Sequence, residues 1–315
     1  MDKELLKIEN LTIGFPTKSG IHTVVDHVNL EVGKGEIVGI VGESGSGKSM
    51  TSLAVMGLLS EEAQVSEGSI RLNGQELLGM SREERRKIQG RNMSMIFQEP
   101  MTSLNPVMKI GTQVGESLKL HTDLDKETIR KRVIETLASV GLRNPETLID
   151  QYPHEISGGM KQRVALLRAL ACDPKVLLMD EPLGAVDFQM RQLLQRQLED
   201  ILGQKKTTSL MVTHDVDESV YLSDRVIVMS RDHGKILEDL KIDLPRPRDR
   251  TNPQYHAYVD QLTEILKSAL SGGVYTQEDK DIMEFIQGVE SAKKPAADTA
   301  GAAGCAWFSG PVSDC

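Results

Sequence analysis

The segment from Glu36 to Leu59 places the strongest constraint on the fold of this 315-residue chain. It begins with a short apolar run, Ile37 to Val41, that predicts a buried strand, and it continues through a glycine-rich turn into a helix. The turn, Gly42 to Ser49, reads GESGSGKS and fits the phosphate-binding pattern GxxxxGK(S/T), called the P-loop. A strand is predicted before this turn and a helix after it, and the GKS sequence is intact. A merely flexible Gly/Ser turn is therefore the weaker interpretation.

Each residue type in this loop has a physical reason to be there. Gly45 and Gly47 allow backbone conformations that are barred to other residues. Main-chain N–H groups at the start of the following helix then point at a phosphate, and the helix dipole favours an anion there. Lys48 would reach the β- and γ-phosphates, and the Ser49 hydroxyl would complete a Mg²⁺ shell. We therefore expect the nucleotide to be bound by Gly42, Ser44, Gly45, Ser46, Gly47, Lys48, Ser49 and Met50.

Charge and hydropathy argue against several classes of protein. The chain carries 37 Lys and Arg against 46 Asp and Glu, and this net charge of −9 opposes a main role in binding nucleic acid. No apolar run approaches the roughly 20 residues of a transmembrane helix, and the N-terminus has no secretory hydrophobic segment. Three cysteines, of which Cys305 and Cys315 lie in the tail, do not make a disulfide framework. We therefore expect a soluble chain that stays in the cytoplasm unless a partner holds it at a membrane.

The order of the predicted elements indicates an α/β fold. Strand-like stretches within residues 5–32 predict an antiparallel β layer, and a hairpin with its turn at Asn73-Gly74 returns to that layer. From about residue 101 to 165 loops and helices replace strands, which predicts a helical insertion; its clearest helix covers 124–141. Later apolar strands alternate with helices, which is typical of βα units and a mostly parallel central sheet.

Polar side chains follow several predicted strands at the sheet edge where open α/β sheets bind ligands. Asp180 and Glu181 follow a continuous apolar strand, and burying two carboxylates without partners would be costly. Asp180 can hold Mg²⁺ through water, and Glu181 can orient or deprotonate an attacking water. Gln98 and His214 end two other strands. Each of these two side chains could instead be an ordinary polar residue at a strand end. Their position at the ligand-binding edge of the sheet favours a functional role.

Two further features suit a nucleotide. Phe15 is an aromatic in an aromatic-poor region and could stack on a base, with a core phenylalanine as the equal alternative. Ser157, Gly158 and Gly159 lie at the mouth of a helix predicted over 160–171, a second place where N–H groups can meet a phosphate.

The C-terminal part of the chain has weaker signals. A Pro/Arg-rich stretch, LPRPRDRTNP, starts at residue 244 and precedes a helix predicted over 255–270. From about residue 291 the composition is small-residue and low-complexity, which is typical of disorder. The predicted scheme is a nucleotide-binding domain over 1–243, a linker and helical extension over 244–290, and a disordered tail over 291–315.

Taken in order, the motifs resemble those of the ATP-binding subunits of ABC transporters. The set comprises GESGSGKS, Gln98, ISGGMKQR, VLLMDEP, GAVD and His214, and it spans roughly residues 4–240. The resemblance implies a P-loop NTPase fold with ATP and Mg²⁺ as its ligands. It also implies that Phe15 stacks on the base, and that Gln98 senses the γ-phosphate and Mg²⁺ and couples to a membrane subunit. Ser157, Gly158 and Gly159 correspond to the signature that caps ATP bound to the other protomer.

The same resemblance implies roles at the strand ends. Asp180 is similar to the Walker B aspartate that holds Mg²⁺ with Ser49, and Glu181 to the general base. Asp187 matches the D-loop aspartate, and His214 the switch histidine. Two such subunits enclose two ATP molecules, so the chain is expected to dimerise with itself or a paralogue. Its other expected partners are transmembrane permeases and, indirectly, an extracytoplasmic solute-binding protein, which would place it peripherally at the cytoplasmic face of the cell membrane.

The motifs point to two importer groups. GRNMSMIFQEPMTSLNPVMKIGTQVGE and YPHEISGGMKQRV resemble the oligopeptide/dipeptide/nickel group, whereas MDEPLGAVDF and LPRPRDR, after Met179, resemble the nitrate/sulfonate/taurine group. We favour the peptide or nickel group because the helical insertion carries the contact with the membrane subunit. Non-transport ABC ATPases have a long coiled coil or two ATPase units in one chain, and this sequence shows neither feature. P-loop kinases and GTPases lack the SGG signature, which this sequence has.

Overall fold

An antiparallel sheet forms the N-terminal layer of the protein. The computed structural model describes residues 4–18, 20–98, 103–184 and 188–270. The sheet has the order β2-β1-β4-β5 and consists of β1 (Glu4–Thr17), β2 (Gly20–Gly33), β4 (Gln64–Leu72) and β5 (Gln75–Glu76). Asn73 and Gly74 join the last two strands with φ angles of 50° and 81°, the left-handed pair that a tight hairpin turn requires. The predicted antiparallel layer and its hairpin are confirmed.

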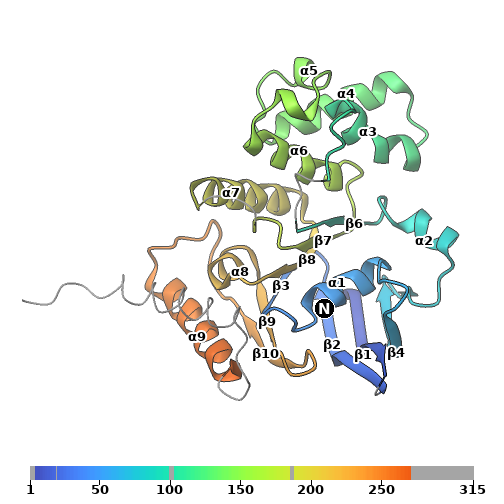
Figure 1. Cartoon of the computed structure of the whole chain (residues 1–315). Helices are drawn as coiled ribbons and strands as arrows, with labels where there is room; N and C mark the ends of the chain where they lie inside the picture. The colour runs from blue at the N-terminus through green and yellow to red at the C-terminus, as the bar shows by residue number, and fades with distance from the viewer. Residues whose placement is uncertain (1–3, 19, 99–102, 185–187, 271–315) are drawn as a thin grey trace, which may run out of the picture. The chain divides into compact units, whose positions relative to one another are not determined.

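A six-stranded sheet of order β10-β9-β3-β8-β7-β6 lies at the centre (Figure 1). Its strands are β3 (Ile37–Gly42), β6 (Met93–Ile96), β7 (Val176–Asp180), β8 (Thr208–Thr213), β9 (Arg225–Met229) and β10 (Ile236–Lys241). The only antiparallel pairing among these described strands is that of β10 with β9. Every residue of β3, β7 and β8 is buried, as expected for parallel strands covered on both faces. The predicted mostly parallel sheet is confirmed.

Alternate residues of the central strands contribute to two separate cores. Val38 and Ile40 of β3 pack with the antiparallel layer and with α1 (Lys48–Met56). Ile37 and Val41 of the same strand pack on the other face, because successive side chains of a strand point in opposite directions. That second core contains side chains of α7 (Phe188–Lys205), α8 (Val216–Leu222) and α9 (Pro253–Leu270). The P-loop helix is therefore packed between the two sheets.

The helical region forms a third core beyond the β6 edge of the sheet (Figure 1). It contains α3 (Ile110–His121), α4 (Lys126–Ser139), α5 (Pro145–Leu148), the 3₁₀ turn η1 (Pro153–Glu155) and α6 (Gly158–Leu170). The Asp125 side chain accepts a hydrogen bond from Thr128 N at 2.8 Å, which caps α4, and Gly141 (φ 68°) follows the helix. The short helix α2 (Arg82–Ile88) lies outside this region, between β5 and β6.

Residues after 243 pack against the same body as far as they are described. Tyr255 of α9 is only 1% exposed, and its hydroxyl donates to the Asp217 carbonyl oxygen at 2.9 Å. Arg250 pairs with the Asp217 carboxylate at 2.7 Å and lies 3.9 Å from the centre of the Tyr221 ring. The domain boundaries at 243 and 290 stay predictions, and the predicted tail, with Cys305 and Cys315, lies outside the described residues.

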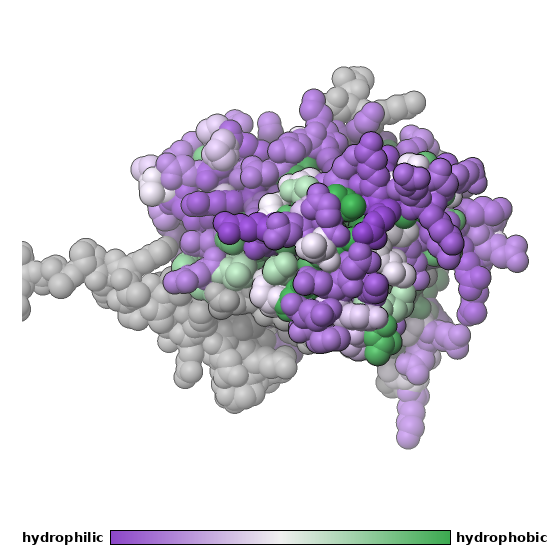
Figure 2. Space-filling view, turned by 90° about the horizontal axis from the view of Figure 1, so that it is seen from above, coloured by the Kyte–Doolittle hydropathy of each residue, from purple (hydrophilic) through white to green (hydrophobic). Residues whose placement is uncertain are grey.

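The view onto the helical end shows a largely hydrophilic surface with small hydrophobic groups (Figure 2). Among the described residues the most exposed large hydrophobic side chains include Val107 (79%) and Leu120 (71%) of this region. None of the described helices is both long enough and apolar enough to cross a bilayer.

Candidate functional site

The P-loop connects β3 to α1 in the conformation that its glycines permit. Gly45 and Gly47 have left-handed φ angles of 81° and 78°, which glycine adopts without a Cβ penalty. At Gly47 there is a second requirement, because a Cβ there would lie 2.5 Å from the Val24 carbonyl oxygen of β2. Ser44 and Gly45 are exposed, whereas Ser46, Gly47 and Lys48 are buried. The loop thus presents its tip to solvent and anchors its base on β2.

Lys48 is folded back into the loop. Its Nζ donates to the Glu43 carbonyl oxygen at 2.5 Å and to Ser46 Oγ at 3.3 Å. Burial lowers the pKa of Lys48 to about 8, although the nearby Glu181 and Asp180 carboxylates favour its charged form. A phosphate beside Nζ would restore the stabilisation that the buried ammonium has lost from water, so the environment of Lys48 suits an anionic ligand.

Ser49 and Asp180 meet where the P-loop helix begins and β7 ends. Ser49 Oγ donates to Asp180 Oδ1 at 2.8 Å. Burial raises the pKa of Asp180, and the bond from Ser49 acts in the opposite direction. A hydroxyl and a carboxylate are hard oxygen donors, which suit Mg²⁺. In the described part of the chain no three His, Cys, Asp or Glu side chains form a metal cluster.

The Glu181 carboxylate is bonded at both oxygens. His214 Nδ1 lies 3.2 Å from Oε1, and Gln98 Nε2 donates to Oε2 at 3.0 Å. The bond with His214 is the main cause that lowers the pKa of Glu181 and raises the pKa of His214. The three side chains expected from separate strand ends therefore lie together, at the end of β7, after β8 and after β6.

The backbone at Glu181 is unusual. Its φ is 46°, in the left-handed region that few residues other than glycine adopt. The Glu181 N–H donates to the Val212 carbonyl oxygen at 2.8 Å, and its own carbonyl accepts from Gly184 N at 3.1 Å. These bonds hold the residue in a sparsely populated conformation, a feature that often marks functional sites.

Glu218 supports this edge and was not predicted from the sequence. It is 3% exposed, and Thr213 Oγ1 donates to its Oε2 at 2.5 Å. Burial raises the pKa of Glu218 to about 7. The pattern Asp215-x-x-Glu218 is the signature of a helix start, and Asp215 does cap α8 by accepting from Glu218 N at 3.1 Å. The pattern predicts the start of a helix. It does not predict that the Glu218 carboxyl is buried against Thr213, the residue before His214.

Phe15 lies on a hairpin that touches the P-loop. It is half-buried and pairs with His22 across the β1–β2 ladder. Two residues further along β2, the Val24 carbonyl oxygen packs against Gly47. This position suits a base-stacking role, which stays a prediction, as does the alternative of a packing residue.

The predicted signature residues begin α6 in the helical region. Ser157 caps the helix by accepting from Met160 N at 3.4 Å, and Ser157 and Gly158 are exposed. A Cβ at Gly159 would lie 2.8 Å from Met190 Cε, so the helix approaches α7 closely there. Asp187 lies outside the described residues.

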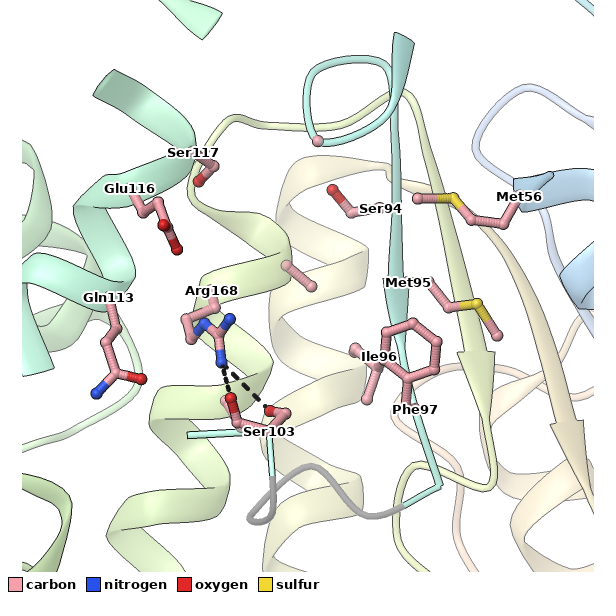
Figure 3. A pocket seen from close by; sticks show the side chains of 13 residues that line it. Met56, Ser94, Met95, Ile96, Phe97, Ser103, Gln113, Glu116, Ser117 and Arg168 are labelled. Carbon is pink, nitrogen blue, oxygen red and sulfur yellow. Dashed lines mark hydrogen bonds between the residues drawn. The ribbon is translucent and has the colours of Figure 1, made fainter. Parts of the chain in front are cut away.

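A pocket of about 210 Å³ separates the β6 edge from the helical region (Figure 3). Phe97, next to Gln98, lines one side, and Glu116 of α3 and Arg168 of α6 line the other. Arg168 donates to the Ser103 carbonyl oxygen at 2.6 Å and to Ser103 Oγ at 3.3 Å. The lining of the pocket comes from segments that are distant in the sequence, so local sequence patterns did not predict the pocket.

Known proteins are similar to this chain in both sequence and fold. A profile of the ABC transporter family matches residues 25–184. The oligopeptide transport ATP-binding protein AppD of Bacillus subtilis is 42% identical over 240 residues, which cover 76% of this chain and 73% of AppD. The dipeptide transport ATP-binding protein DppD of Haemophilus influenzae is 36% identical over 289 residues, which cover 92% of this chain and 83% of DppD. DppD of Escherichia coli is 43% identical over 236 residues, covering 74% and 71%.

Among solved structures, the dimeric structure of MJ0796, a bacterial ABC transporter cassette, has a TM-score of 0.66 and 28% sequence identity. The alignment covers 76% of this chain and 99% of the cassette. A dimeric post-hydrolysis state of the same cassette, bound to ADP and Pi, also aligns with a TM-score of 0.66, at 27% identity.

Proposed function

Because the chain belongs to the ABC transporter family, we propose that it is the ATP-binding and ATP-hydrolysing subunit of a peptide importer. Binding of ATP closes a dimer of such subunits, and hydrolysis reopens it. The observation that carries the proposal is the cluster at the end of β7, where Ser49 bonds to Asp180 while Gln98 and His214 hold both oxygens of Glu181. This cluster lies directly beside a phosphate-binding loop.

In the proposed reaction, Lys48 and the loop N–H groups bind the β- and γ-phosphates. Ser49 and Asp180, with Gln98, would hold Mg²⁺, which neutralises phosphate charge when bound. Glu181 takes a proton from the water that attacks the γ-phosphorus, while the bond from the γ-phosphorus to the bridging oxygen breaks and leaves ADP. His214 orients the Glu181 carboxylate and keeps it ionised, as the lowered pKa of Glu181 supports.

A second subunit completes the proposed site. Ser157 and Gly158 are exposed at the start of α6, in the helical region rather than at the P-loop. The first N–H groups of a helix have no partner within the helix, so this helix start suits a phosphate presented by another protomer. The dimeric form of the MJ0796 cassette supports a similar pairing here, either of two identical chains or with a paralogue.

The proposed membrane partners are permease subunits at the cytoplasmic face of the cell membrane, with a solute-binding protein acting indirectly. The pocket beside Phe97 suits a permease segment, because it lies between the helical region and the strand that leads to Gln98. Peptides are the proposed solutes, since AppD and DppD are named for oligopeptide and dipeptide transport. The motifs after Met179 resemble the nitrate/sulfonate/taurine group, but no structural feature of the described residues favours such a solute.

The test has an enzymatic and a cellular arm. The purified chain should hydrolyse ATP in a Mg²⁺-dependent reaction, and Lys48→Ala should abolish nucleotide binding while the fold is retained. Cells that lack the gene should lose uptake of a labelled dipeptide or oligopeptide, and the wild-type gene, but not Lys48→Ala, should restore it. Nucleotide affinity that is unchanged by Lys48→Ala would overturn the site. Normal peptide uptake in the deletion strain would overturn the choice of solute.

A further inference from the structure

Two histidines from distant parts of the chain meet beside the P-loop. His22 lies on β2 and His233 in the turn between β9 and β10, and their ring centres are 6.4 Å apart with an interplanar angle of 59°. His233 Nδ1 lies 2.9 Å from the Thr23 carbonyl oxygen. Because a carbonyl oxygen can only accept, Nδ1 must carry the proton in this bond.

The turn that carries His233 is built against both β2 and the P-loop. His233 and Gly234 have φ angles of 56° and 60°, the left-handed pair of a tight hairpin turn. A Cβ at Gly234 would lie 2.5 Å from the Val24 carbonyl oxygen and 2.9 Å from the Ser46 carbonyl oxygen. Glycine is therefore required, and the close approach fixes His233 next to the phosphate loop.

The same part of the hairpin carries Phe15. Phe15 and His22 are direct cross-strand partners, so their side chains leave the same face of the sheet. Phe15 is half-buried, and both histidines are exposed. His233 thus adjoins, through His22, the face on which a base is proposed to stack.

We propose that His22 and His233 extend the Phe15 surface into a wall that binds the purine base, and that His233 favours adenine over guanine. The inference rests on the proposed function, because it takes the P-loop as the triphosphate site. With its proton on Nδ1, the His233 ring offers the lone pair of Nε2 as an acceptor. Adenine presents an amino donor at the position where guanine presents a carbonyl, so an acceptor at Nε2 selects adenine.

The test compares the full-length protein with His22→Asn, His233→Asn and a matched control, His27→Asn. Asparagine tolerates the left-handed φ of 56° at His233 and of 51° at His27, and it replaces the ring with a short amide. His27 is an exposed histidine of the same strand, but its ring bonds to Asp26 at 2.5 Å and lies 3.4 Å from Glu67. Dissociation constants are measured at pH 8 for Mg-ATP, Mg-GTP and inorganic tripolyphosphate, with thermal unfolding to verify the fold.

Both His22→Asn and His233→Asn should weaken ATP binding by about five- to tenfold through lost stacking, and His27→Asn should not. Tripolyphosphate binding should be unchanged, because the loop is intact. His233→Asn should also reduce the ATP-to-GTP preference by about fivefold, the effect of one hydrogen bond. His233→Gly, which also suits the turn, should reproduce these changes.

Three results would overturn the inference: unchanged ATP affinity in both variants, an equal loss for ATP and tripolyphosphate, or an unchanged ATP-to-GTP ratio in both His233 variants. Lys48→Ala separates this inference from the function on which it rests. If tripolyphosphate binds the wild-type chain without needing Lys48, the proposed phosphate site itself is wrong. If binding needs Lys48 and the histidine variants have no effect, only the base-binding wall is wrong.

Discussion

His214 Nδ1 lies 3.2 Å from Glu181 Oε1, and this contact shifts the pKa of both residues. It is the main cause of the lowered pKa of Glu181 and of the raised pKa of His214. Over the pH range between those two values the carboxylate is ionised and the imidazolium is charged. A general base must be ionised before it can take a proton, so the pair keeps Glu181 in the form that the proposed general-base role requires.

Replacing Glu181 with glutamine should stop hydrolysis and spare ATP binding. The amide keeps the shape of the side chain but cannot take a proton, and loss of a general base costs about 10²- to 10⁴-fold in rate. Steady-state phosphate release and ATP affinity provide the measurement, and sizing with ATP should show an accumulated dimer. Glu61→Gln, at a side chain that is 93% exposed, is the control. Near-normal turnover of Glu181→Gln would refute the assignment.

The His214–Glu181 contact should also make stability depend on pH. A histidine whose folded pKa is raised contributes stability that is present below its unfolded pKa of about 6.5 and is lost as pH rises through the folded value. The difference in free energy of unfolding between wild type and His214→Gln should therefore shrink as pH increases from 6 to 9. Urea unfolding at several pH values measures it. A difference that stays constant across this range would show that the contact carries no charge.

Glu218 should also make the stability of the fold depend on pH, because its carboxyl is buried. Burial raises its pKa to about 7, so the folded state binds a proton that the unfolded state has already lost above about pH 4.5. Stability associated with Glu218 therefore falls as pH rises from about 4.5 through 7. Glu218→Gln removes this titrating group, so the stability of the variant relative to wild type should improve over that pH range, as followed by urea unfolding. A relative stability that does not change with pH would mean that Glu218 remains ionised in the fold.

Two glycines of the P-loop allow a matched comparison. Gly45 and Gly47 have nearly equal left-handed φ angles, 81° and 78°. A Cβ at Gly45 would meet nothing within 4 Å, whereas at Gly47 it would lie 2.5 Å from the Val24 carbonyl oxygen. Gly45→Ala should cost about 1–2 kcal/mol for the backbone conformation alone. Gly47→Ala should cost clearly more and should weaken ATP binding, as measured by urea unfolding and nucleotide titration. Equal costs would show that the loop moves away from β2 freely.

Features encoded in short segments were predictable, and features that join distant segments were not. The P-loop, the hairpin at Asn73-Gly74 and the cap at Asp125 each depend on a few neighbouring residues, whose backbone preferences are local. The position of Glu181 beside His214 followed from parallel strands that end at one edge. The contact between Thr213 and Glu218, by contrast, needs burial to become apparent. The pair His22 and His233 spans most of the chain, and a glycine at 234 gives no local sign of the carbonyls that it meets.

Two substitutions at Tyr255 of α9 separate the contribution of burial to stability from that of a hydrogen bond. Tyr255 is 1% exposed, and its hydroxyl donates to the Asp217 carbonyl oxygen at 2.9 Å. Tyr255→Phe removes the hydroxyl and should cost about 0.5–1.5 kcal/mol. Tyr255→Ala also leaves a cavity among the side chains of the second core and should cost about 3–5 kcal/mol, as for other large aromatic truncations. Urea unfolding of both variants measures the two costs. If α9 were a loosely attached extension, both changes would cost less than about 0.5 kcal/mol, the range of ordinary surface substitutions.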